Sequence, residues 1–93
     1  MATYKVGEMI LIPVSAGNGA FSGERLIAFD TLDGPISGFI GSDQVVTRNG
    51  KTLIRAEILG VAPSHITVRL HGSFFTTTGL AHIDRHTSYL RAA

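Results

Sequence analysis

The chain of 93 residues contains no cysteine and no tryptophan, and only 16% of its residues are charged. The absence of cysteine excludes a disulfide framework, a thiolate nucleophile and cysteine-ligated zinc. The longest strongly apolar run covers residues 9–14, far short of the roughly 20 residues that a membrane-spanning helix needs. Disorder is also excluded, because 44% of the residues are hydrophobic and the net charge is only +1. We therefore expect a folded protein without a membrane partner.

The sequence also lacks the apolar segment after a basic start that marks a secretory signal, so we expect a cytoplasmic protein. Its length corresponds to a single domain, residues 1–93, because a typical domain has about 100–150 residues. A chain of this size buries only about 60–65% of its unfolded surface on folding. A lone copy is therefore expected to be marginally stable.

Residues that normally cover helix surfaces are scarce. Glutamate, lysine and glutamine together number only 6, whereas valine, isoleucine and threonine number 24. Branched side chains fit a pleated sheet, and 11 glycines divide the apolar runs into short pieces. The composition predicts an all-β fold, or a mainly β fold with a short C-terminal helix, built as a small barrel or half-barrel of about five to six strands. In outline this resembles SH3-like barrels, an analogy of fold that implies nothing about function.

Apolar alternation and turn signals divide the chain into short strands. We predict strands over residues 8–14, 24–31, 36–40, 45–48, 51–61 and 65–71. Asn49-Gly50 is the strongest hairpin signal, because both residues tolerate a positive φ. The glycine-rich residues 15–23 predict a loop. The tail has two interpretations, since residues 80–84 fit a strand and residues 80–90 also fit a helical stripe.

One predicted hairpin carries an exposed ion pair. A turn centred on residues 62–63 places Glu57 opposite Arg69 and Arg55 near His71. Opposite charges that face each other across two strands stabilise a sheet by roughly 0.2–1 kcal/mol. A solvated sheet face therefore explains these residues without any function.

Two segments, residues 9–14 and residues 25–29, are apolar on both alternating faces. A strand of this kind needs cover on both sides, so either the sheet closes into a barrel or a second copy supplies the cover. Our leading hypothesis is therefore a non-enzymatic binding or assembly module that forms a homo-oligomer, with another protein as an alternative partner. The predicted self-association residues are Met9, Leu11, Ile27 and Phe39.

An alternative hypothesis is a nucleic-acid-binding protein. Residues 1–47 carry a net charge of −3, whereas residues 48–93 carry +4. Six of the eight basic residues are arginine, which binds phosphate through a planar fork, and Phe74 and Phe75 are candidate stacking platforms for bases. Against this, the pI of 8.3 lies below the value of about 9 that is typical of dedicated binders. The candidate nucleic-acid contacts are Arg48, Lys51, Arg55, Arg69 and Arg85.

A weaker alternative is a small metal-dependent enzyme around His82, Asp84 and His86. A helix would place the two histidines four residues apart on one face, and a strand would place all three residues on one face. Two ring nitrogens and a carboxylate suit zinc or another divalent cation. Ile83 stands where a zinc protease has glutamate, so no protease is predicted. Exposed histidines on a polar face, with Asp84 in a salt bridge to Arg85 or a neighbour, are the plainer interpretation and need no cofactor.

Other catalytic motifs are incomplete. The glycines at residues 17, 19 and 23 resemble a dinucleotide-binding loop, but a predicted strand follows them where that loop needs a helix. Residues 50–52 resemble the end of a phosphate-binding loop, yet Val45 stands where that motif needs glycine. No serine lies in a recognisable strand-to-helix elbow. The sequence therefore nominates no catalytic residue from these motifs.

Overall fold

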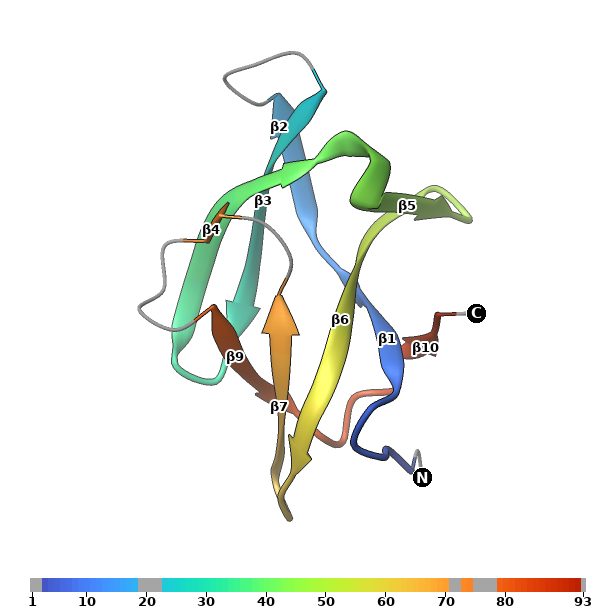
Figure 1. Ribbon diagram of the computed structural model, residues 1–93, viewed down its shortest axis with the longest axis vertical. Coiled ribbons are helices and arrows are strands. Elements are labelled where there is room, and N and C mark those ends of the chain that lie inside the picture. The colour runs from blue at the N-terminus through green and yellow to red at the C-terminus, as the bar shows by residue number, and fades with distance from the viewer. Residues whose placement is uncertain (1–2, 19–22, 71–72, 75–78, 93) are drawn as a thin grey trace.

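The computed structural model describes residues 3–18, 23–70, 73–74 and 79–92. Its elements are short β-strands and a single 3-10 turn, η1 (Figure 1). In chain order they are β1 (Met9–Pro13), β2 (Ser15–Asn18), β3 (Glu24–Thr31), β4 (Gly34–Gly41), η1 (Ser42–Gln44), β5 (Val45–Arg48), β6 (Lys51–Val61), β7 (His65–Leu70), β8 (Ser73–Phe74), β9 (Leu80–Asp84) and β10 (Leu90–Arg91). Within these ranges, no helix has the length and apolar character needed to cross a membrane.

The strands form two antiparallel sheets. The larger has the order β10-β1-β6-β7-β9, with β5 also paired to β6, and the smaller has the order β2-β3-β4-β8. The chain passes from the larger to the smaller sheet between β1 and β2, where the N–H of Val14 donates to the carbonyl of Thr52 (3.0 Å). It returns through η1, between β4 and β5 (Figure 1). The chain passes between the sheets twice more, because β8 of the smaller sheet lies in sequence between β7 and β9 of the larger sheet.

The prediction of an all-β fold is confirmed, and the predicted C-terminal helix is wrong. No α-helix occurs in the described ranges, and residues 80–84 form β9, which pairs with β7. Ala81 and Ile83 enter the core with a period of two, at 4% and 2% exposure, so the strand interpretation of the tail accounts for its burial. In the described ranges the two sheets remain separate and do not close into a barrel.

The predicted loop over residues 15–23 is wrong at its start. Residues 15–18 form β2, and residues 19–22 lie outside the described ranges. β2 pairs with β3 so that Ala16 lies opposite Ile27, and Ala16 packs against the core. Ala16 thus gives β2 a residue that packs against the core, although the glycine-rich composition predicts a loop. The bounds of β3, β5 and β6 are as predicted, and the other predicted strands differ by one or two residues at an end.

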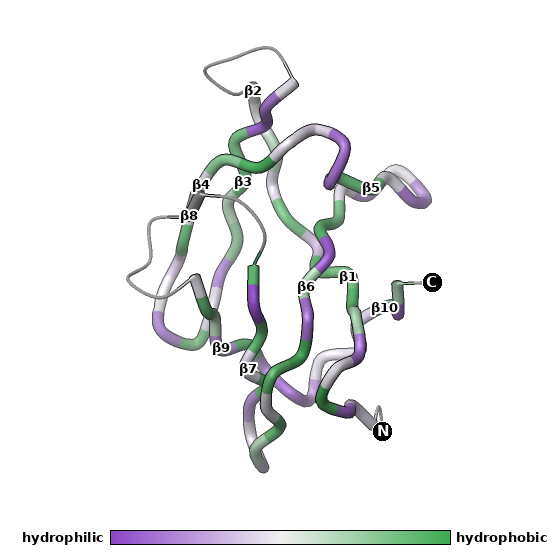
Figure 2. Tube along the Cα trace, in the orientation of Figure 1, coloured by the Kyte–Doolittle hydropathy of each residue, from purple (hydrophilic) through white to green (hydrophobic). Residues whose placement is uncertain are grey.

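The core lies between the sheets and consists mainly of aliphatic side chains. Hydrophobic and polar residues alternate along β6 and β7 (Figure 2), so one face of each strand enters the core. Among the described residues, no polar or charged side chain is buried. Full burial of an aliphatic side chain stabilises the fold by about 1.5–3 kcal/mol. The buried cluster comprises Tyr4, Ile10, Ile12, Ile27, Ile40, Ile54, Ala56, Ile58, Ile66, Val68, Leu70, Ala81 and Ile83.

The β5–β6 hairpin turns at Asn49-Gly50, as predicted. These residues have φ values of 53° and 75°, and Arg48 and Lys51 form the last cross-strand pair. Two left-handed residues in a row are typical of a type I′ turn, whose twist matches that of the flanking strands. The turn therefore holds two cationic residues next to each other at the end of the larger sheet.

Replacing the second turn residue tests this hairpin. We expect Gly50→Ala to lower the free energy of unfolding by about 1–2 kcal/mol, because a side chain is strained in the left-handed region. Gly17→Ala is the matched control: its φ lies outside that region and its added Cβ meets open space, so we expect no loss of stability. Urea unfolding measures both variants. An equal loss in the two would contradict the assigned turn.

Candidate functional site

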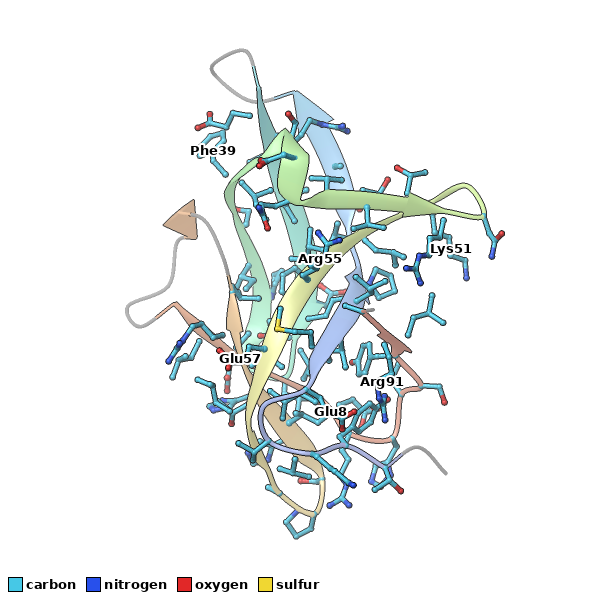
Figure 3. The ribbon with its side chains drawn as sticks, turned by 45° about the vertical axis from the view of Figure 1, so that its right-hand side comes forward. Glu8, Phe39, Lys51, Arg55, Glu57 and Arg91 are labelled. Carbon is cyan, nitrogen blue, oxygen red and sulfur yellow. The ribbon has the colours of Figure 1, made fainter. Side chains whose placement is uncertain are left out.

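The long strand β6 presents two different faces. Its residues Ile54, Ala56 and Ile58 are fully buried in the core. Because side chains alternate along a strand, the residues between them belong to the opposite face, here called the outer face of the larger sheet. Figure 3 shows Lys51, Arg55 and Glu57 following one another along this strand. The same alternation assigns Leu53 to the outer face.

A hollow of about 280 Å³ opens on the outer face. Leu11 and Leu53 belong to its floor, since they are 1% and 2% exposed yet lie outside the main core cluster, and the exposed Pro13 lines the hollow beside them. The exposed side chains of Arg48 and Lys51 line its rim. The remaining lining residues are Asn49, Ser88, Tyr89 and Leu90. The hollow therefore joins an apolar floor to a cationic rim.

The hollow exists because β10 covers only part of the neighbouring edge of β1. β10 pairs with Ile10 and Leu11 and extends no further toward Pro13. Tyr4 holds the preceding segment in place: its hydroxyl donates to the carbonyl of Thr87 (2.6 Å) and accepts from the N–H of Tyr89 (2.8 Å). Pro13 has no N–H, so this uncovered part of the edge has no backbone donor there to satisfy.

Three cations on the outer face have no partner among the described residues. They are Arg48, Lys51 and Arg55, here called the cationic strip; for none of them does the described structure give a hydrogen bond or an ion pair. The other four arginines all have partners. Arg25 donates to the carbonyl of Gly17, Arg69 pairs with Glu57, Arg85 donates to the carbonyl of Ala62, and Arg91 pairs with Glu8.

The five predicted nucleic-acid contacts thus fall into two groups, those with a partner within the fold and those without one among the described residues. Arg69 lies opposite Glu57, as predicted, with 3.4 Å between Nη1 and Oε1. This pair is solvent-exposed, so it contributes about 0–1 kcal/mol. Arg85 donates from Nη1 to the carbonyl of Ala62 (2.9 Å) and so fastens the β6–β7 turn. His71 and Phe75 lie outside the described residues. Of the five, only Arg48, Lys51 and Arg55 have no intramolecular partner among the described residues.

The four predicted self-association residues do not form one exposed face. Ile27 is fully buried in the core from the smaller sheet, and Leu11 is buried in the floor of the hollow. Met9 is half-buried on the same face of β1 as Leu11, and Phe39 is half-buried on β4, in the other sheet. Alternation within each strand and the division into two sheets place these residues on different surfaces.

Two of the three candidate metal ligands, His82 and Asp84, use their side chains within the fold, whereas His86 is exposed. Nδ1 of His82 lies 2.8 Å from Oδ2 of Asp33, and the carboxylate of Asp84 accepts from the N–H of His86 (3.0 Å) and the hydroxyl of Thr87 (3.2 Å). β9 ends at Asp84 and the chain turns, so His86 does not continue the strand face. In the described ranges, no three histidine, cysteine or acidic residues are placed to hold a metal ion.

His82 instead fastens one sheet to the other. Its carbonyl accepts the N–H of Leu32 (2.8 Å), while its ring contacts Asp33, and both partners lie in the β3–β4 turn. The ring of His65 packs edge-on against it, with centroids 5.1 Å apart. The turn of the smaller sheet is thereby docked on β9. Arg85 is not the partner of Asp84, because it donates to a backbone carbonyl, and the carboxylate of Asp84 accepts from its neighbours His86 and Thr87 instead.

The sequence nominated the cationic strip but not Leu53, Tyr89 or Leu90. The alternation of lysine, leucine, arginine and glutamate at residues 51, 53, 55 and 57 was a usable signal for an outer face around Leu53. For Tyr89 and Leu90 no local signal exists, because their position depends on pairing with β1, far away in sequence.

Comparisons with known proteins leave the site to be interpreted from its own geometry. No protein-family model matches the sequence, and no curated protein or solved structure is significantly similar to the chain.

Tyr89, which lines the hollow, makes a pH-dependent contribution to the stability of the protein. Burial raises the pKa of its phenol above the ordinary value of 10.0, opposed by a hydrogen bond with Thr87 and assisted by the charge of Asp84. As pH rises past 10.0, the unfolded phenol loses its proton before the folded one does, so the free energy of unfolding falls until the folded pKa is passed.

We therefore expect the Tyr89→Phe variant to lose less stability at alkaline pH than the wild type. Urea unfolding at several values between roughly pH 8 and pH 11 measures the difference, which is expected to be absent at the lower end. If the free energy of unfolding depended on pH in the same way for both proteins, Tyr89 would not be the cause of the alkaline loss of stability.

Proposed function

We propose that this chain is a non-enzymatic binding module that holds an anionic partner on the cationic strip. The observation that carries the proposal is that Arg48, Lys51 and Arg55 have no partner among the described residues, although the other arginines do. They gather along one hairpin, next to a hollow whose lining contains no acidic residue. A surface of this kind favours negative charge.

Two further features support an anionic partner. The nearest acidic residue along the same face of β6, Glu57, already pairs with Arg69. Arginine offers a planar fork of donors to phosphate or carboxylate groups. The strip also lies on a rigid part of the fold, since β6 is hydrogen-bonded to three other strands.

We also propose that the fold is an open half-barrel of the SH3-like type.

Single-stranded nucleic acid is the polyanion suggested by the composition, so oligothymidylate of about 15 nucleotides is a suitable probe. Three phosphate contacts predict that log K falls with log salt concentration at a slope of about −2, because each contact on a single strand contributes about −0.7. We expect Lys51→Gln to weaken binding and to reduce the slope to about −1.4. Fluorescence anisotropy over a salt series measures both quantities.

The matched control is Lys5→Gln, because Lys5 is an exposed lysine that belongs to neither β5 nor β6. This variant should retain the affinity and the salt slope of the wild type. Absence of binding at low salt, or equal effects of Lys5→Gln and Lys51→Gln, would contradict the proposed surface.

We propose self-association as a second candidate function, on one specific observation. Leu90 is 51% exposed on β10, a two-residue strand at the edge of the larger sheet. A second copy packed on this edge would cover that side chain. Leu11 is not a suitable test position, because it is 1% exposed and its replacement by a charged residue would disrupt the fold itself.

Light scattering coupled to size-exclusion chromatography tests self-association. We expect the wild type to exceed the monomer mass of 9.9 kDa and Leu90→Ser to elute closer to that mass. Leu32→Ser is the control, since Leu32 is 56% exposed but lies at the β3–β4 turn. A monomeric wild type, or the same mass for all three proteins, would rule out an interface at Leu90.

A further inference from the structure

We infer that the hollow on the outer face binds a small aliphatic carboxylate, with its alkyl chain on the apolar floor and its carboxylate between Arg48 and Lys51. The inference deepens the proposed function and rests on it, because both use the same two cations. It adds the chemical class of a ligand, which the charges alone do not define.

The floor of the hollow indicates that the buried part of the ligand is apolar. Leu11 and Leu53 are almost completely buried from solvent, and Pro13 and Leu90 line the hollow beside them. None of these four side chains carries a polar atom, and the neutral polar residues of the lining are Asn49, Ser88 and Tyr89. Ligand sites commonly combine an apolar lining with a few placed polar groups.

The cationic rim indicates that the ligand carries a negative charge. Arg48 and Lys51 are a cross-strand pair, both exposed and both without a partner among the described residues. Arginine accepts a carboxylate bidentately, and the lysine ammonium adds a second donor.

The volume limits the size of the ligand. The hollow measures about 280 Å³, at the lower end of ligand pockets, which begin at about 300 Å³. A hollow of this size suits a short-chain acid, and hexanoate is a suitable probe.

NMR titration of the ¹⁵N-labelled protein with butanoate, pentanoate and hexanoate tests the inference. Each added methylene should strengthen binding about four-fold, as expected for a methylene removed from water. The amide shifts should gather at residues 48–53 and 88–90, which surround the hollow. Hexanol should bind more weakly than hexanoate, and hexylammonium should not bind. Affinity independent of chain length, or equal affinity for hexanol and hexanoate, would overturn the inference.

Two variants separate the rim from the fold. Lys51→Gln should weaken hexanoate about two- to five-fold, the value of one exposed charge contact, and leave hexanol unchanged. Lys5→Gln should leave both unchanged. An equal effect of the two variants on hexanoate would overturn the assignment of the rim.

The outcomes for the two proposals are distinguishable. Oligothymidylate binding that depends on Lys51, without hexanoate binding, would overturn the carboxylate site and keep the cationic strip as a binding surface. Hexanoate binding that follows chain length but is insensitive to Lys51→Gln would overturn the role of the cations in the carboxylate site, whereas the oligothymidylate series tests their role in the cationic strip.

Discussion

The structure depends on the alternation of side chains along β6. This strand of 11 residues is hydrogen-bonded to β1 on one edge and to β5 and β7 on the other. Its inward residues Ile54, Ala56 and Ile58 are fully buried, so the core fixes the rotation of the strand. A slip of one residue would bury Arg55 and Glu57 and expose the isoleucines, at a cost the fold does not tolerate. Core packing thereby determines which residues the outer face presents.

The proposed binding surface follows from that constraint. The outer face has no second sheet over it, so its cations are free to take a partner unless a neighbouring acid engages them. On this face Glu57 engages Arg69. Arg91 lies opposite the core-facing Ile10, on the other face of β10, where it pairs with Glu8 and stacks on Tyr4 at 4.5 Å from the ring centroid. Among the described residues, no acidic side chain pairs with a cation at the hairpin end of β6. There the incomplete cover by β10 leaves leucines and unpaired cations together in one hollow.

The features that were predictable from sequence are local ones. Asn49-Gly50 determines a hairpin through backbone conformations that few residues tolerate, and that hairpin defined the bounds of both its strands and placed Arg48 beside Lys51. The features that failed depend on pairing between distant segments. β2 is a strand only because β3 lies beside it, and His82 meets Asp33, 49 residues away. Likewise, three members of the site were nominated, but the hollow itself was not, because its walls come from opposite ends of the chain.

The central claim is that Arg48 and Arg55 are left for an anionic partner, whereas the other four arginines hold the fold. The side-chain Nε–Hε signals of the six arginines, recorded by NMR with and without oligothymidylate, test it most directly. The structure predicts that the signals of Arg48 and Arg55 shift on binding, while those of Arg25, Arg69, Arg85 and Arg91 keep their positions. Shifts confined to the four partnered arginines, or no shift at all, would contradict it.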